Sequence, residues 1–408
     1  MSEDASSVVE ILTARGVRLP RPEGVFFGPD VDPDRIAPGV TIHPGGRILG
    51  AATSIGPGSV IGAEGPATVE DCQLGRGVEL KGGYFSGATF LDGANMGSCA
   101  HVRPGTLLEE EASAAHAVGF KQTILFPFAI TGSLINFCDV LLAGGTSRKD
   151  HSEVGSSYIH FNYTPHGDKA TASLLGDVPR GVFLDRPRIF LGGQGGLVGP
   201  VRIAYGTVVA AGRIQRKDLL TEGQLVAGAA AEAVDRPFVA GAYLGIARIV
   251  RNNLIYAGNL LALRLWYRRV RAAAPARDAF DRAALEGARR RLDEGLAERL
   301  KRLGELAAAM PRSLRLAEAA GARTQDPPYD QQRRFAERWP EIESALRSGF
   351  EERTAEAERD AFLADWSAVA GREDHVARVR ALPPGARARG AAWLQAVVDA
   401  AAAAVAAG

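Results

Sequence analysis

The chain has 408 residues, enough for two or three domains, and its 48 basic and 47 acidic side chains give a net charge of +1 at pH 7. This balance gives no support for binding nucleic acid or an anionic membrane through overall charge. The three cysteines, Cys72, Cys99 and Cys138, show no paired spacing, which favours free thiols in a reducing compartment.

Residues 1–36 are predicted to form an N-terminal extension, with a short helix at 6–15 before the extended run PRPEG. The extension carries acidic residues early and no long apolar core, so it does not resemble a signal peptide. The most apolar stretch, 254–265, is interrupted by Asn259 and Arg264 and is too short to span a bilayer. We therefore expect a cytoplasmic protein without a membrane span.

Between residues 37 and 229 an apolar residue returns at every sixth position, commonly beside a glycine. Clear examples are Leu191, Leu197, Ile203 and Val209, and also Val118, Ile124 and Ile130. A helix repeats near 3.6 residues and a strand near two, whereas six residues fit a short strand and a turn. Three such sides close one coil, so the spacing predicts a parallel β-helix of hexapeptide repeats with a continuous apolar core.

Two segments interrupt this rhythm, 144–157 and 162–172. Loops on a rigid scaffold often carry function, and these two are the most polar and histidine-bearing parts of the coil, although tolerated insertions are the alternative. Three of the seven histidines, His151, His160 and His166, fall between residues 146 and 171.

Each of these histidines is a candidate acid or base near neutral pH, as acyl transfer requires. Arg148 and Lys169 in the same segments are candidate phosphate ligands. The alternative is that one histidine faces the core while the others cap loops. A metal site is less favoured because no HxH or HxxxH spacing occurs.

The run GGQGGLVGP at 192–200 resembles a phosphate loop, but it lacks the Lys-Ser/Thr ending and stays within the six-residue rhythm. We interpret it as tight corners that let another backbone or a ligand approach closely. Nucleotide binding is the weaker alternative. The candidate cofactor contacts are Gly192, Gly193, Gly195 and Gly196.

From residue 230 to 408 Ala, Arg, Glu and Leu dominate at helical spacing, which predicts an α-helical C-terminal region. The later helices are expected at about 277–309, 329–350, 352–370 and 387–406. Pro311 is among the expected helix breakers. Arginine is interleaved with glutamate at i,i+4 spacing, which favours a solvated, oligomerising or partner-binding surface over nucleic-acid binding.

The run 100–217 resembles the acetyltransferase half of the bifunctional bacterial enzymes that make UDP-N-acetylglucosamine. In that family a left-handed β-helix trimer acetylates glucosamine-1-phosphate with acetyl-CoA. The segments that carry the resemblance are AHVRPGTLLEEEA, AVGFKQTIL, TGSLINFCD, SSYIHFNYTPHGDKAT and VGPVRIAYGTVVAAGRIQRKD. The handedness is taken from this resemblance, since crossovers between parallel strands are normally right-handed.

The resemblance implies that Arg103, Lys121 and Lys169 hold a sugar phosphate, and that Asn162 and Tyr163 contact the sugar or the acyl donor. It also implies acetyl-CoA or another acyl-CoA as co-substrate, a sugar phosphate or UDP-sugar as substrate, and a homotrimer. The helical region has no counterpart in the resemblance.

Two departures concern the reaction itself. Ser133 stands where the family has its catalytic histidine, and Asn136 stands where it has a sugar-contacting tyrosine. Both are retained as candidate substrate contacts, and the general base is then expected from His151, His160 or His166.

The sequence thus predicts a sugar-phosphate or sugar-nucleotide acyltransferase. One alternative is a sugar-nucleotide-binding or scaffold trimer that has lost acyl transfer and recruits a protein partner through its helices. A weaker alternative is a UDP-sugar pyrophosphorylase, although the residues before the coil do not supply the expected uridyltransferase half.

Overall fold

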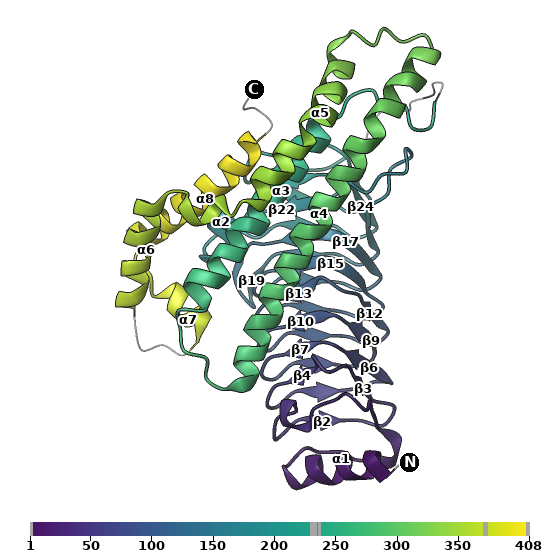
Figure 1. Cartoon of the computed structure of the whole chain (residues 1–408). Helices are drawn as coiled ribbons and strands as arrows, with labels where there is room; N and C mark the ends of the chain where they lie inside the picture. The colour runs from purple at the N-terminus through teal and green to yellow at the C-terminus, as the bar shows by residue number, and fades with distance from the viewer. Residues whose placement is uncertain (1–2, 229–234, 236–237, 370–373, 405–408) are drawn as a thin grey trace.

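The computed structural model describes residues 3–228, 235, 238–369 and 374–404. Short strands follow one another from residue 26 to 226, and long helices occupy most of 247–403. Figure 1 shows the strands stacked into a column, with the N-terminus at its lower end and the helices along one side. The predicted fold class, a left-handed parallel β-helix followed by an α-helical region, is confirmed.

Most coils contribute one strand to each of three faces, and neighbouring coils pair in parallel. Face 1 consists of β2 (Thr41–Ile42), β5 (Val60–Ile61), β8 (Glu79–Leu80), β11 (Asn95–Met96), β14 (Ser113–Ala114), β16 (Ile130–Thr131), β20 (Glu153–Val154), β23 (Phe190–Leu191), β26 (Val208–Val209) and β28 (Leu225–Val226).

Faces 2 and 3 join because two long strands, β15 (Gly119–Leu125) and β17 (Ile135–Leu142), continue around the corner between them. Besides the first halves of these two, face 2 holds β1 (Phe26–Phe27), β3 (Arg47–Leu49), β6 (Ala67–Glu70), β9 (Gly83–Ser86), β12 (Ala100–Val102), β21 (Tyr158–Phe161), β24 (Gly195–Val198) and β27 (Ile214–Gln215). Besides their second halves, face 3 holds β4 (Ser54–Ile55), β7 (Gln73–Leu74), β10 (Ala88–Phe90), β13 (Thr106–Leu108), β22 (Ser173–Leu175) and β25 (Arg202–Ile203).

The residues that recur every sixth position point into the coil, one from each of its three sides. On face 1 the row of such residues is fully buried at Ile42, Ile61, Leu80, Met96 and Leu191. Stacking of these residues from coil to coil builds one continuous apolar core. Because β1 pairs with β3, the coil begins at residue 26, inside the segment expected to be an extension.

Three insertions interrupt the column. The two expected ones are a hairpin, β18 (Gly145–Ser147) with β19 (Asp150–His151), and the loop 162–172. The third, 176–189, contains α2 (Val178–Gly181), and it was not predicted because its apolar residues continue the composition of the coil. Residues 153–154 lie in register in β20 although the rhythm predicted a break there.

The helices are α1 (Glu3–Ala14), which lies at the lower end of the column, and then α3 (Ala247–Trp266), α4 (Ala279–Ala319), α5 (Pro327–Arg347), α6 (Glu356–Ala368), α7 (His375–Arg380) and α8 (Pro384–Ala403). Short helical turns are η1 (Pro22–Gly24), η2 (Pro33–Arg35), η3 (Tyr267–Arg271) and η4 (Phe350–Arg353).

The prediction that Pro311 ends a helix is wrong, because α4 continues through it to Ala319. Pro311 itself is exposed, and the loss of one backbone donor is offset by contacts of the buried residues on either side of it. The buried Met310 lies beside it, and Ser313 donates to Gln332 of α5 at 2.8 Å.

Helix α4 lies along face 3, across β4, β7, β10 and β13 (Figure 1). A glycine permits this close approach, since a Cβ at Gly287 would lie 2.3 Å from Gln73 Oε1 and 2.7 Å from Thr89 Oγ1. Helix α3 contacts β22 higher up the same face, and α8 packs on α3. Face 3 is therefore covered by the chain's own helices.

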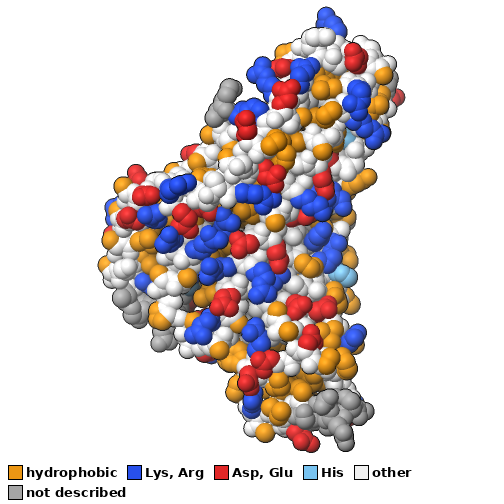
Figure 2. Space-filling view, viewed as in Figure 1, with side chains coloured by type: hydrophobic (Ala, Val, Ile, Leu, Met, Phe, Trp, Pro, Cys, Tyr) orange, Lys and Arg blue, Asp and Glu red, His pale blue; other side chains and the backbone are white. Residues whose placement is uncertain are grey.

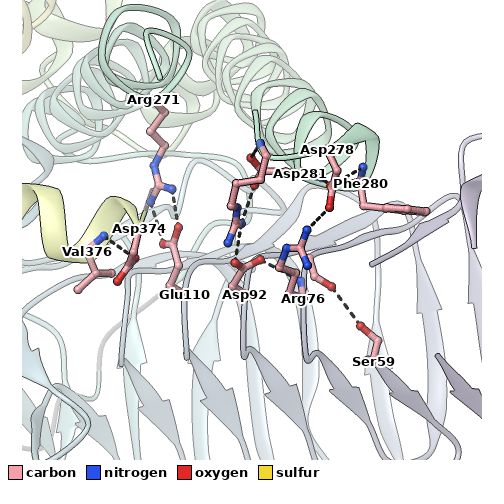
Figure 3. A network of polar contacts seen from close by, with 12 residues as sticks. Ser59, Arg76, Asp92, Glu110, Arg271, Asp278, Phe280, Asp281, Asp374 and Val376 are labelled. Atoms are coloured by element: carbon pink, nitrogen blue, oxygen red, sulfur yellow. Dashed lines mark hydrogen bonds and ion pairs between the residues drawn. The ribbon is translucent and has the colours of Figure 1, made fainter. Parts of the chain in front are cut away.

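Ion pairs form between the helices and the turns that lead from face 3 to face 1 (Figure 3). Arg271 of η3 donates to both carboxylate oxygens of Glu110, at 2.6 and 2.9 Å. Arg76, in a turn of the coil, pairs with Asp278, whose carboxylate also caps α4 by accepting from the Phe280 N–H at 3.0 Å. Figure 2 shows basic and acidic side chains interspersed over the helices, as the alternating charges predicted.

Candidate functional site

Face 2 carries a column of polar side chains in consecutive coils. His101 pairs with Gly119 and Val102 with Phe120, which places Arg103 and Lys121 at successive positions of the column. Lys121 in turn pairs with Cys138. Arg103 reaches along the column to donate from Nη2 to Cys138 Sγ at 3.3 Å. We call Arg103, Lys121 and Cys138 the cationic column.

A second outward column runs beside it through His101, Gly119, Asn136 and Ile159. Gly119 leaves a notch in this column, because a Cβ there would meet nothing closer than Asn136 Oδ1 at 3.6 Å. His101 and Asn136 are exposed on either side of it, while Lys121 on the same strand is half-buried. The side chains around the notch are therefore two cations, Arg103 and Lys121. The Asn136 amide and the His101 imidazole lie beside them.

This combination suits an anionic, hydroxylated ligand. A guanidinium and an ammonium bind phosphate oxygens, Arg with two parallel N–H donors and Lys as a point charge. The Asn136 amide can both donate to and accept from sugar hydroxyls. Four of the residues predicted to bind substrate thus lie on or beside face 2: Arg103, Lys121, Asn136 and, at its edge, Ser133.

Ser133 lies at the corner that leads from face 1 to face 2, between β16 and β17. Its Oγ is 2.9 Å from Nδ1 of His116, which occupies the same corner one coil earlier. Its backbone N–H donates to Ser156 Oγ, one coil later, at 3.2 Å. His116 is exposed and Ser133 half-buried, so the hydroxyl and the imidazole meet at the surface.

His160 lies inside the coil, where β21 stacks on β17. Both ring nitrogens are engaged there, Nδ1 with Cys138 O at 2.5 Å and Nε2 with Ser173 Oγ at 2.8 Å. Only 2% of the residue is exposed, and burial lowers the pKa of His160 from 6.5 to about 4. Its surroundings are those of a neutral core histidine.

His151 and Arg148 occupy the β18–β19 hairpin, which lies between faces 3 and 1, at the corner opposite face 2. The backbone oxygen of Arg148 lies 2.9 Å from His151 Nδ1, and the Arg148 guanidinium donates to Glu111 O at 2.7 Å. Within one chain the structure therefore does not bring this pair together with the notch.

The loop 162–172 leaves face 2 directly after Phe161, the position that follows Cys138 in the cationic column. Tyr163 is 64% exposed, and Asn162 and Lys169 are half-buried in the same loop. His166 packs against Tyr243, with the two ring centroids 4.3 Å apart and the rings tilted by 31°.

The four glycines at 192–196 lie at a corner and on face 2, in register with their neighbours. A Cβ at Gly192 would lie 2.2 Å from the Ala211 backbone nitrogen, and one at Gly193 2.6 Å from Ser156 O. A Cβ at Gly195 would lie 2.7 Å from the Tyr158 ring, and one at Gly196 would lie 2.8 Å from Ile159 O. Packing between coils therefore requires glycine at these positions, and their role toward a cofactor stays a prediction.

Among the residues that the structure describes, no three His, Cys, Asp or Glu side chains are grouped so that they could hold a metal ion. Within the same described part of the chain, no helix has the length and apolar character needed to cross a membrane.

Comparison with curated proteins finds distant similarity to bifunctional GlmU proteins. The bifunctional protein GlmU of Kineococcus radiotolerans is 28% identical over 204 residues, which cover 50% of this chain and 37% of that protein. The one from Thermus thermophilus is 31% identical over 190 residues, 46% of this chain and 37% of its own length. The one from Nitratidesulfovibrio vulgaris is 29% identical over 192 residues, or 45% and 38%. The match thus covers about half of this chain and under two fifths of these relatives, and no protein-family model matches the chain.

His116, His101 and the notch at Gly119 were not predicted from the sequence. The sequence spacing does relate Ser133 to His116. The two are separated by 17 residues, which is the length of one coil in this part of the column. Counting back one coil from each candidate residue would have found its neighbour on the same corner or face.

Proposed function

We propose that this chain is a sugar-phosphate or sugar-nucleotide acyltransferase of the hexapeptide-repeat kind, using acetyl-CoA or another acyl-CoA. The observation that carries the proposal is the juxtaposition of Arg103, Lys121 and Asn136 around the notch at Gly119. The distant similarity to the GlmU proteins supports the same assignment. In this proposal Arg103 and Lys121 hold the phosphate, and Asn136 orients the sugar.

We further propose that the active form is a homotrimer assembled through face 2. Apolar side chains remain exposed there, with Ile159 at 42% and Phe161 at 41%. Face 3 is covered by the helices, which leaves faces 1 and 2 for contact between copies. Sedimentation of the full chain tests this, with a trimer expected and with Ile159→Asp expected to dissociate it. A monomer at micromolar concentration contradicts the proposal.

The activity is tested by incubating the full chain with acetyl-CoA and a panel of amino-sugar phosphates and UDP-sugars. Release of free thiol together with an acylated sugar in the mass spectrum is the expected result. Lys149→Ala, on the hairpin at the opposite corner, is the matched control and retains the wild-type rate. Absence of an acylated product from every acceptor contradicts the proposal.

A second function is favoured by Ser133, which offers a hydroxyl where the related enzymes have an imidazole. In it the coil binds a sugar nucleotide without transferring an acyl group. Calorimetry separates the two, since binding of a UDP-sugar without binding of CoA supports the second function and binding of both supports the first.

A further inference from the structure

The corner between faces 1 and 2 places a hydroxyl and an imidazole from consecutive coils in direct contact. His116 follows β14 and Ser133 follows β16, and these strands pair in parallel with Ala114 opposite Thr131. The two side chains therefore project from equivalent positions one coil apart. Ser133 Oγ lies 2.9 Å from His116 Nδ1, within reach for transfer of the hydroxyl proton.

The corner around this pair is held rigidly and is open to solvent. The Ser133 N–H donates to Ser156 Oγ, and the Ser133 carbonyl accepts from the Ser157 N–H at 2.8 Å, so the next coil fixes the Ser133 backbone on both sides. The neighbours in sequence are small, with Gly132 before Ser133 and alanines on both sides of His116. An incoming carbonyl group therefore meets little steric hindrance.

An apolar contact lies beside the hydroxyl. Leu134 follows Ser133 directly and is 57% exposed. A short acyl chain brought to Ser133 can cover this side chain. A hydroxyl, a base and an apolar surface at one exposed corner are the components needed to accept an acyl group.

We propose that Ser133 is a nucleophile activated by His116, and that it carries the acyl group as an ester between donor and acceptor. This inference rests on the proposed acyl transfer and adds a covalent intermediate to it. It assigns the base to His116, which is distinct from His151, His160 and His166.

In the first step Ser133 Oγ attacks the carbonyl carbon of an acyl thioester while His116 Nδ1 accepts the hydroxyl proton. The carbon–sulfur bond breaks, and the thiol leaves with that proton. In the second step the amine of the acceptor attacks the ester carbon and loses a proton to His116. The carbon–oxygen bond breaks, and Ser133 Oγ takes the proton back, so the amide forms and the pair is restored.

The experiment traps the ester and maps it. The full chain is incubated with acetyl-CoA or with p-nitrophenyl acetate, quenched in acid, digested and analysed by mass spectrometry. One acetyl group on the peptide that contains Ser133 is expected with the wild type. Ser133→Ala abolishes it, Ser133→Cys restores it as a thioester, and Ser98→Ala, a serine at the same corner two coils earlier, leaves it unchanged. His116→Gln slows acylation about 100-fold.

Three results overturn the inference: no acetyl group on Ser133 from either donor, equal acylation rates in the wild type and His116→Gln, or sugar acylation by Ser133→Ala at the wild-type rate. The last of these leaves the proposed acyltransferase standing without the intermediate. Conversely, acetyl-Ser133 that passes to no sugar supports the inference and contradicts the proposed acceptor. Circular dichroism of each variant checks that the coil is folded.

Discussion

Arg299 of α4 and Asp139 of β17 form an ion pair buried between the helices and the coil, with 2.5 Å between Nη2 and Oδ1. Arg299 is 1% exposed and Asp139 5%. Asp139 follows Cys138 directly, so the pair fixes the strand that carries the cationic column at the point where it turns from face 2 to face 3. Removal of charges from water is costly, and each partner is tolerable only while the other is present.

We expect Arg299→Met to lower the free energy of unfolding by about 3–5 kcal/mol, because it leaves a buried carboxylate without its partner. Adding Asp139→Asn should recover part of this loss by removing the unpaired charge. Urea unfolding provides the measurement. Arg347→Met, which breaks an exposed pair with Glu343, is the control and should cost less than about 1 kcal/mol. Equal losses in the two single variants would contradict the assignment.

Two glycines of α4 should respond in opposite directions to the same substitution. Gly287→Ala is expected to destabilise the protein by about 1–3 kcal/mol, because its Cβ would collide with the buried, hydrogen-bonded side chains of Gln73 and Thr89. Gly295→Ala should stabilise it by up to about 1 kcal/mol through helix propensity, since the nearest atoms lie 3.6 Å away. Thermal unfolding of both variants tests the close approach of α4 to face 3, and stabilisation by both would refute it.

His160 should make the protein sensitive to acid. Its pKa is about 4 in the folded chain, below the ordinary 6.5, so the unfolded chain binds the proton more readily. The stability that it contributes is complete above pH 6.5 and is lost as the pH falls through 4. We expect the wild type to lose about 3 kcal/mol more than His160→Gln between pH 7 and 4. Parallel pH dependence of the two urea midpoints would exclude this role.

The cationic column should determine affinity for the proposed acceptor. Arg103→Ala and Lys121→Ala are each expected to raise KM for a sugar phosphate about 10- to 100-fold, because a charge-assisted contact contributes about 1.5–3 kcal/mol. KM for the same sugar without phosphate should change little. Steady-state kinetics with the paired acceptors checks this expectation, and an equal effect on both would place these residues outside the phosphate site.

The coil was predictable because its rhythm depends on local geometry: one inward side chain per side, repeated at Leu191, Leu197 and Ile203. The insertion at 176–189 was not predictable, because residues such as Val178 and Phe183 are as apolar as the coil and bury their side chains against the helices. Pro311 illustrates the same limit, since contacts distant in sequence sustain α4 beyond it.

The candidate site could be predicted from the sequence only in part. Arg103 and Lys121 became candidate phosphate ligands through the family resemblance, and the register of the strands places them side by side. Histidines were harder to interpret, because an imidazole serves equally well inside the core, as His160 does, or at the surface, as His116 does. Only the fold distinguishes these surroundings.

The length of α4 has a consequence for how the molecule unfolds. Its 41 residues extend about 60 Å, alongside coils that otherwise touch only their nearest neighbours. A bare solenoid can fray one coil at a time from either end. Here Arg291 donates a hydrogen bond to the Gly87 carbonyl, and Arg299 donates one to Asp139, three coils further on. Those coils therefore cannot separate unless α4 also detaches. By bridging several coils, α4 makes them unfold together in one cooperative transition instead of one after another.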